Sequence, residues 1–309
     1  MSKLTTSSYL NKFGYSDHPI LERSDSKVRI RVVIPCFNEP DITSSILSLN
    51  NAAPPESEVE VIVVINCSEK DSESIMAANK ESVVELENLK GTVWFGLEIL
   101  DLKLPEKHAG VGLARKIGMD EALCRFEDED GVIVCFDADS LVSTNYFTEI
   151  EKAFNSGING ANIHVEHPLN GENAMEIAKY ELFLRYYNLG LNYADLPYAH
   201  FTIGSAMAVS CGSYIKIGGM NKRKAGEDFY FLQKVIGLGN FIEITDCTVI
   251  PSDRISDRVP FGTGKAIGEL KNSTEYNTYS VEAFELLKTA SAAIRNFDVA
   301  AIPTEILEY

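Results

Sequence analysis

The segment "VEVIVVIN" (residues 59–66) is a nearly continuous run of β-branched residues. Such a run is typical of a strand buried on both faces, as occurs in parallel sheets that helices cover on either side. Strand-like segments also occur at residues 28–35, 93–100 and 131–139, and they alternate with helical segments. Crossover helices of this length predict a doubly wound, mostly parallel α/β sheet flanked by helices.

The rest of the chain can be divided on the same basis. Residues 1–27 are polar and irregular and are expected to form an N-terminal arm. Residues 28–272 are expected to form the sheet domain, and residues 273–309 a helical C-terminal extension. The predicted helices are 39–49, 68–89 with Ser68 as N-cap, 111–126, 172–193, 227–238 and the tail from 278, and the further strands are 160–166, 201–210 and 241–250.

The charge balance narrows the classes of partner. There are 28 Lys and Arg residues against 45 Asp and Glu residues, for a formal net charge of -17. This argues against a nucleic-acid partner, which needs a basic face, and against broad adsorption to anionic lipid. Residues 196–215 lack Asp, Glu, Lys and Arg, but they are too polar for a transmembrane span. Peripheral contact with a membrane is left open.

The cysteines and the N-terminus indicate the cellular compartment in which the protein is expected. The six cysteines form no CxxC pair, and several lie inside apolar runs, where Cys behaves as a small hydrophobe. The first twenty residues lack the apolar core of a signal peptide. The expected location is the reducing cytoplasm.

Several familiar sites are excluded by specific checks. A dinucleotide-binding fold needs G-x-G-x-x-G after its first strand, and residues 36–39 contain no glycine there. "FGTGKAI" (261–267) resembles a Walker A loop, but Ala266 stands in place of the hydroxyl residue. His164, Glu166 and His167 lack a further ligand at zinc spacing.

Polar residues follow each of the first four predicted strands. These strand ends read "PCFNEP", "NCSEKD", "DLKLPEKHAGVG" and "DADS". Ligands bind outside the carboxyl ends of the strands in an open parallel sheet, so four polar ends at one edge predict a site. Asp137 and Asp139 would repel each other there unless a cation or several donors compensated them.

Five motifs in order resemble those of a family 2 glycosyltransferase of the GT-A fold, from about residue 29 to 240. They are "VVIPCFNEP", "VVINCSEKD", "HAGVGLARKIG", "VCFDADS" and "GGMNKRKAGEDFYF". The resemblance implies transfer of a sugar from a nucleotide-diphosphate donor to an acceptor hydroxyl, usually with inversion and with Mg²⁺ or Mn²⁺. Cell-envelope polysaccharide is an expected setting, and the acceptor stays unknown.

The resemblance also implies roles for residues around the donor. Asp139 is the expected metal ligand, and Asp137 is expected to lie against the ribose or to assist the metal. Asn66 stands where many members carry an Asp that pairs with uracil, so the identity of the base is open. The remaining expected nucleotide-binding residues are Pro35, Phe37 and Glu39 in the first loop and Arg115 beside the diphosphate. The alternative for Arg115 is a solvent-facing helix residue.

On the acceptor side, Glu227 and Asp228 match the family's "ED" pair. Asp228 is the expected general base, whereas the alternative is a pair of acidic residues favoured by the helix dipole. Gly204 and Ser205 match a segment that lines the acceptor. A loop over the diphosphate or over an anionic acceptor is predicted from its basic residues, Arg254, Arg258 and Lys265. The QxxRW motif of processive synthases is absent from this loop.

Three other functions remain open from the sequence. The same fold could serve a catalytically silent nucleotide-sugar binding protein or a retaining glycosyltransferase. A nucleotidyltransferase is a third alternative, but it needs a loop rich in Gly, Arg and Lys after the first strand, and "CFNEP" is not such a loop.

Overall fold

The structure is a computed structural model, and it describes residues 5–16, 20–21, 28–127, 130–255, 262–272, 277–297, 301–303 and 306. The chain forms two compact units. The sheet unit comprises Met1–Glu166 and Thr202–Ser252, and the helical unit comprises His167–Phe201 and Asp253–Tyr309. The boundaries predicted at residues 27 and 272 do not coincide with this division and stay a prediction.

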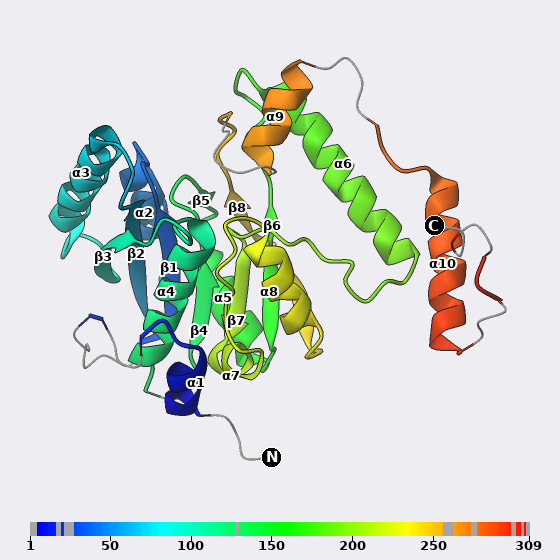
Figure 1. The fold of residues 1–309 in the computed structure, drawn as a ribbon, viewed down its shortest axis with the longest axis horizontal. Coiled ribbons are helices and arrows are strands. Elements are labelled where there is room, and N and C mark those ends of the chain that lie inside the picture. Colours follow the sequence, from blue (N-terminus) through cyan, green and yellow to red (C-terminus); the bar gives the residue numbers. More distant parts are fainter. Residues whose placement is uncertain are drawn as a thin grey trace. The chain divides into compact units, whose positions relative to one another are not determined.

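The sheet unit is built on one eight-stranded sheet within the described residues, in the order β3-β2-β1-β4-β7-β6-β8-β5 (Figure 1). Strands β1 to β4 run parallel, and β7 is antiparallel to both of its neighbours, β4 and β6. The strands are β1 (Val28–Cys36), β2 (Glu58–Ser68), β3 (Gly96–Leu104), β4 (Val132–Cys135), β5 (Leu141–Val142), β6 (Gly160–Val165), β7 (Met207–Ser210) and β8 (Phe241–Ile250). The mixed, mostly parallel α/β sheet agrees with the prediction.

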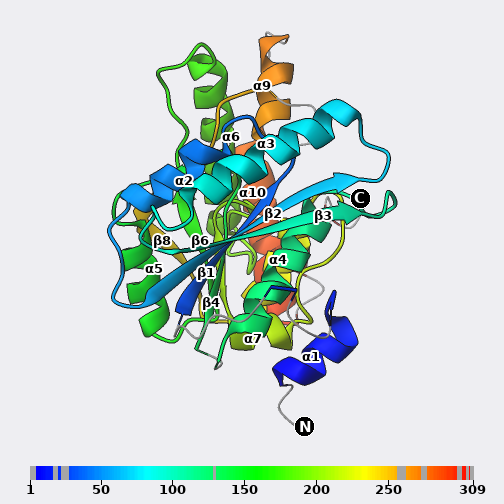
Figure 2. The ribbon, with the colours of Figure 1, turned by 90° about the vertical axis from the view of Figure 1, so that its left-hand side faces the viewer.

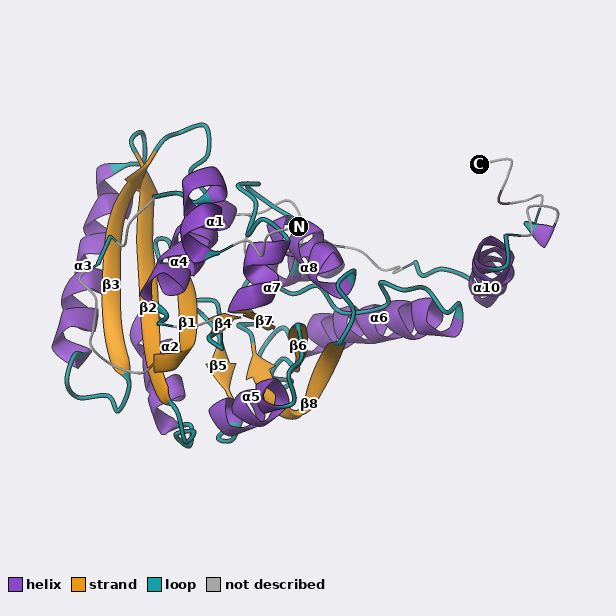
Figure 3. Ribbon diagram, turned by 90° about the horizontal axis from the view of Figure 1, so that it is seen from below, coloured by secondary structure: helices purple, strands orange, loops and turns teal. Residues whose placement is uncertain are grey.

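Helices cover both faces of this sheet. Alternate residues of β1 pack into two different cores, because Val32 lies in one hydrophobic cluster and Val33 in the other. The first cluster includes residues of α2 (Ile42–Asn51), α3 (Glu73–Leu89) and α5 (Tyr146–Asn155). The second includes residues of α1 (Thr6–Phe13), α4 (Val111–Arg125), α7 (Cys211–Lys216) and α8 (Glu227–Ile236). Figures 2 and 3 show α3 and α4 on opposite faces of the first three strands.

Helix α4 is buried along its whole length from residue 112 to residue 125. The sheet covers one side of it, and the N-terminal segment covers part of the other. Tyr9 of α1 is fully buried and donates a hydrogen bond to Asp120 Oδ1 at 2.7 Å. The backbone N–H groups of Ile20 and Leu21 donate to Glu121. The prediction that residues 1–27 are irregular is therefore wrong for α1, whose Tyr9 anchors it to α4.

Other element boundaries also differ from the prediction. The third strand begins at Gly96 rather than at residue 93. The N-cap of α3 is Ser72, whose side chain accepts from Ile75 N, whereas Ser68 is the last residue of β2. The last predicted strand before α7 is confined to β7. Helix ends depend on local capping geometry, so shifts of this size are expected from sequence alone.

The helical unit contains α6 (Ala174–Tyr193), α9 (Thr263–Lys271) and α10 (Val281–Arg295). Phe284 of α10 packs against Gly190, where an added Cβ would lie 2.3 Å from the phenyl ring. His167 donates its backbone N–H to Glu181 at 2.6 Å, and its Nε2 lies 3.1 Å from Thr263 Oγ1. Burial raises the pKa of Glu181, but hydrogen bonds from His167 and Arg185 outweigh burial and lower that pKa to about 2.

One further expectation concerns the helical unit. Lys265 was predicted in a loop, but it lies on α9 and faces Glu269 at 3.9 Å. No helix among the described residues is long and apolar enough to cross a membrane.

Candidate active site

The four parallel strands end at one edge of the sheet, as predicted from their polar ends. Strand β1 ends at Cys36, β2 at Ser68, β3 at Leu104 and β4 at Cys135, and β1 lies between β2 and β4. The loops that follow these strands are therefore neighbours. They bring together the first loop, the Asp137–Asp139 segment and the start of α4, all within the sheet unit.

The first loop is fixed by a set of buried amides. Asn66 Nδ2 donates to Cys36 O at 2.9 Å, and Asn79 Nδ2 donates to Asn66 O at 2.9 Å. The Oδ1 of Asn79 accepts from the backbone N–H of Asn38, which has a positive φ of 46°. Asn66 is 3% exposed, and its NH₂ group is used within the fold. Only the side-chain carbonyl of Asn66 is left to contact the nucleotide base, which is the role predicted for this residue.

The other residues predicted in the first loop lie in the same place. Pro35 is buried at the end of β1, Phe37 is half-buried and Glu39 is 4% exposed. Their position beside the end of β4 is compatible with a nucleotide, and their roles stay a prediction.

The Asp137–Asp139 segment directly follows β4. Both carboxylates are half-buried, and the side chain of Asp137 is 38% exposed. Ser45 of α2 donates its hydroxyl to Ala138 O at 2.8 Å, which fixes the peptide between the two acids. The two side chains are thus accessible at the carboxyl edge of the sheet while the backbone between them is held in place.

Arg115 joins this acidic segment to the "ED" pair. Its guanidinium pairs with Asp137 Oδ1 at 2.6 Å and with Glu227 Oε1. The side chain is 2% exposed, so the alternative of a solvent-facing helix residue is wrong. Burial would lower the pKa of Arg115, but Asp137 and Glu227 raise it overall. An added Cβ on Gly204 would lie 2.7 Å from Arg115 Nη1, so Gly204 leaves room for this cation.

Glu227 and Asp228 open α8 after Gly226, whose φ of 70° favours glycine. Glu227 is 3% exposed, whereas Asp228 is half-buried and accepts a hydrogen bond from Phe229 N at 2.8 Å. Burial raises the pKa of both carboxyls above their ordinary values, although Arg115 opposes this. A raised pKa makes Asp228 a stronger base than a carboxylate in water.

Some residues of the site were not predicted. Asn79 lies on α3 and is 3% exposed, and Asn221 donates to Glu227 O at 2.8 Å. The sequence signal for Asn79 was a polar residue on the buried side of a helix, which needs a partner there. Asn221 belongs to a polar loop, so its sequence carried no such signal.

Asp137 and Asp139 are the carboxylates that the site offers to a metal. Among the described residues, no group of three or more His, Cys, Asp and Glu side chains could hold a metal ion. Mg²⁺ and Mn²⁺ are nevertheless often bound by one or two carboxylates together with substrate phosphates. Asp137 and Asp139 fit that donor set. His167, considered above for zinc, instead contacts Glu181 and Thr263.

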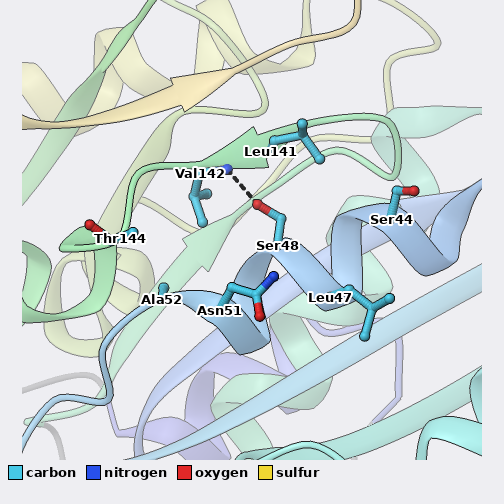
Figure 4. A pocket seen from close by; sticks show the side chains of 8 residues that line it. All are labelled: Ser44, Leu47, Ser48, Asn51, Ala52, Leu141, Val142 and Thr144. Carbon is cyan, nitrogen blue, oxygen red and sulfur yellow. Dashed lines mark hydrogen bonds between the residues drawn. The ribbon is translucent and has the colours of Figure 1, made fainter.

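A pocket of about 400 Å³ lies between α2 and β5, where Ser48 Oγ accepts from Val142 N at 2.9 Å (Figure 4). It contains no ionisable side chain, so it does not suit a diphosphate or a metal. Its lining residues are Ser44, Leu47, Ser48, Asn51, Ala52, Leu141, Val142 and Thr144.

The three residues of the predicted basic loop lie elsewhere in the chain. Arg254 and Lys265 belong to the helical unit, and Arg258 lies outside the described residues. Their role stays a prediction.

Solved structures share the fold. The crystal structure of S. aureus TarS 1–349 with UDP-GlcNAc matches with a TM-score of 0.52 and 14% identity, over 88% of this chain and 73% of that chain. A second crystal structure of S. aureus TarS 1–349 matches with a TM-score of 0.51 and 15% identity, over 88% of this chain and 72% of that chain. The mannosyltransferase PcManGT from Pyrobaculum calidifontis, in complex with GDP-Man and Mn²⁺, matches with a TM-score of 0.50 and 13% identity, over 95% and 77%. These similarities show a GT-A fold.

A comparison with curated proteins gave no significant match. The profile of glycosyl transferase family 2, in contrast, matches residues 31–218, which include most of β1, all of β2 to β4, the acidic segment and Arg115. That match spans more than half of the chain, so the protein belongs to glycosyl transferase family 2 and is a glycosyltransferase.

Proposed function

We propose that this glycosyltransferase moves a sugar from a nucleotide-diphosphate donor to an acceptor hydroxyl, with a divalent metal and with inversion. One observation carries the proposal. The buried guanidinium of Arg115 joins Asp137, on the predicted donor side, to Glu227, next to the predicted base. The groups needed for departure of the diphosphate and for attack by the acceptor therefore flank a single fixed cation.

On the donor side, Asp137 and Asp139 would hold Mn²⁺ or Mg²⁺ together with the donor's phosphates. A divalent ion supplies Lewis-acid stabilisation of the negative charge that develops on a leaving diphosphate. The structure of PcManGT with GDP-Man and Mn²⁺ supports this for the fold. The complex of TarS with UDP-GlcNAc likewise supports a nucleotide-sugar donor. Phe37, Glu39 and the Asn66 carbonyl are the proposed contacts for the nucleoside.

On the acceptor side, Asp228 is the proposed general base. It is half-buried, it lies at the first turn of α8, and its pKa is raised by burial. A carboxylate of this kind can accept the proton of a hydroxyl as the new bond forms. Inversion requires attack from the face opposite the diphosphate, and Asp228 comes from a different loop than Asp139. Glu227 does not serve as the base, because Arg115 already pairs with it.

We also infer that the protein works in the cytoplasm. All six cysteines are buried free thiols in the described structure, which suits a reducing compartment. Arg254, Arg258 and Lys265 remain a proposed basic segment for the diphosphate or an anionic acceptor.

The proposal is tested by calorimetry with UDP and with GDP, each in the presence of MnCl₂ or of EDTA. The wild type should bind one nucleotide with Mn²⁺ and lose most of that affinity in EDTA. Asp139→Ala should lose the Mn²⁺-dependent part, while Asp246→Asn, which changes an exposed carboxylate of the same unit, should bind like the wild type. Equal wild-type affinities with Mn²⁺ and with EDTA would refute the metal-dependent donor site.

A further inference from the structure

Three consecutive cations precede the candidate base. Lys222, Arg223 and Lys224 are exposed and lie two to four residues before Gly226, in a protein with a net charge of -17. The function proposed above does not use them. Among the described residues, neither Lys222 nor Arg223 pairs with a carboxylate. Positive charge is therefore concentrated in one place of an otherwise acidic protein. It lies beside the candidate base, which acts on the acceptor, rather than beside the leaving diphosphate, and it suits an anionic ligand.

This basic segment is fixed at the carboxyl edge of the sheet. It crosses the start of α4 so closely that a Cβ added to Gly112 would lie 2.0 Å from Arg223 O. A Cβ added to Gly110 would lie 3.5 Å from Lys224 Cγ. The ammonium of Lys224 donates to Glu106 O, in the loop after β3, at 3.0 Å. Gly110, just before α4, and Gly112, in its first turn, therefore allow the segment to lie over the end of the helix that carries Arg115.

The segment is also tied to the helix of the candidate base. Asn221 Oδ1 accepts from Arg223 N at 3.1 Å, while Asn221 Nδ2 donates to Glu227 O. The guanidinium of Arg223 lies over the ring of Tyr230 at 3.9 Å. Such stacking holds the planar cation in one orientation and leaves its N–H groups available for an anion.

Two exposed aromatic rings complete the surface. Phe229 and Tyr230 directly follow Asp228, and each is 43% exposed. They meet edge to face, with ring centroids 5.3 Å apart. Exposed aromatic rings beside a candidate base offer apolar faces on which a sugar ring packs, and Tyr adds a hydroxyl at the rim. Arg223 lies over one face of Tyr230, which leaves Phe229 and the other face of Tyr230 for the sugar.

We propose that the acceptor is an anionic saccharide, with its phosphate or carboxylate bound by Lys222 and Arg223 and a sugar ring packed on Phe229 and Tyr230. This rests on the proposed function, because it takes Asp228 as the base. The acceptor hydroxyl then lies between the aromatic pair and Asp228, and the anionic group lies on the side of the basic segment. The donor diphosphate is served separately, by Arg115 and the acidic segment.

The test measures binding of glucose 6-phosphate, glucuronate and inorganic phosphate, with glucose as the neutral reference. Saturation-transfer NMR is used for the sugars and ³¹P NMR titration for the phosphates, with UDP and MgCl₂ present to fill the donor site. At least one anionic sugar should bind more tightly than both glucose and inorganic phosphate, and its affinity should fall with added salt. Glucose 6-phosphate and glucuronate distinguish a phosphate source from a carboxylate source.

Two double variants complete the test. Lys222→Ala/Arg223→Ala should weaken binding of the preferred anionic sugar by about tenfold or more, as expected for lost hydrogen bonds from charged groups. Lys216→Ala/Lys234→Ala removes the same charge from exposed sites on α7 and α8 and should bind like the wild type. Phe229→Ala should weaken binding of the sugar and leave the affinity for inorganic phosphate unchanged.

Each other outcome overturns the proposal in a recognisable way. If the wild type shows no preference for an anionic sugar, the proposal of an anionic acceptor is wrong. If the two double variants lose affinity for the anionic sugar equally, the effect comes from net charge and not from Lys222 and Arg223. A loss of UDP affinity by calorimetry in Lys222→Ala/Arg223→Ala would assign the segment to the donor. Failure of the donor site itself would appear separately, as metal-independent UDP binding in the wild type.

Discussion

Replacing Arg115 with Met would leave Glu227 as a buried carboxylate with no cation beside it. Met keeps most of the length and apolar volume of the side chain, so the main change is loss of the charge. The side chains of Arg115 and Glu227 are 2% and 4% exposed, so water cannot take the place of the lost cation. Breaking a buried ion pair in this way costs about 3–5 kcal/mol. Asp137 is more exposed, so its pairing with Arg115 contributes about 1 kcal/mol or less.

Protonation of Glu227 sets an upper limit on this cost. Without the cation, the folded-state pKa of Glu227 rises further above its unfolded value of about 4.3. The folded variant then holds a proton that the unfolded chain releases, so its stability falls as the pH rises between those two pKa values. At about 1.4 kcal/mol per pH unit, the largest cost at pH 7 is about 3.7 kcal/mol, and at pH 5 it is about 1 kcal/mol.

The assay is urea unfolding of the full chain, followed by the fluorescence of Trp94. This is the single tryptophan of the sequence, and it lies in the sheet unit next to Phe147. Arg115→Met should lose about 3 kcal/mol at pH 7, and no more than about 3.7 kcal/mol, and much less at pH 5. Arg115→Met/Glu227→Gln should recover at least half of the loss, because a neutral amide needs no counter-ion. Lys234→Met provides an exposed control on α8.

Two results would refute this reasoning. A variant within about 1 kcal/mol of the wild type at pH 7 would mean that the ion pair contributes little. A loss that is equal at pH 5 and pH 7, and that Glu227→Gln does not relieve, would assign the effect to packing rather than to charge.

The remaining predictions concern the base and the N-terminal anchor. Asp228→Asn should lower the rate of sugar transfer by about 10²–10⁴-fold, the usual size of general-base catalysis. The affinity for UDP, measured by calorimetry, should stay nearly unchanged. Transfer at the wild-type rate would leave Asp228 as a helix-opening residue. Because a base acts deprotonated and burial raises the pKa of Asp228, kcat of the wild type should fall as the pH decreases through an apparent pKa above 3.8; a midpoint at or below 3.8 would contradict the raised pKa. Tyr9→Phe should destabilise the sheet unit by about 1–3 kcal/mol in the urea assay, because Asp120 loses a buried donor. An unchanged midpoint would show that Tyr214, Lys116 and the backbone N–H of Tyr15 satisfy Asp120 without it.

Much of the fold could be predicted from the first half of the sequence. The run at residues 59–66 predicted a strand buried on both faces, and β2 is buried from Val59 to Ser68. Strands β1 and β4 are buried in the same way, so their order along the chain was clear. Strand β7 was harder, because a four-residue strand between antiparallel neighbours leaves no periodicity to read. Helix α1 was missed because its stability comes from Tyr9 and Asp120, which are 111 residues apart.

The candidate site, like the fold, could be predicted only in part. Asp137 and Asp139 were found because carboxylates after a buried strand need compensation. The connection from Asp137 through Arg115 to Glu227 was not predictable, because it joins three segments that only the folded sheet brings together. Arg115 was expected beside the diphosphate from the resemblance, but its burial could not be predicted. Asp137, Gly204 and Glu227 lie against its guanidinium, and they come from segments far from α4 in the sequence.

The complete burial of α4 has a consequence for how this protein tolerates change. A helix with one solvent face accepts substitutions with a period of about 3.6 residues. Residues 112–125 have no such face, and five of them are charged side chains enclosed within the fold. A saturation-mutagenesis map should therefore show an unbroken block of intolerance along α4, at polar and apolar positions alike. Helix α5, which packs in the other core and has buried residues at Phe147, Ile150 and Phe154, should show the ordinary helical period.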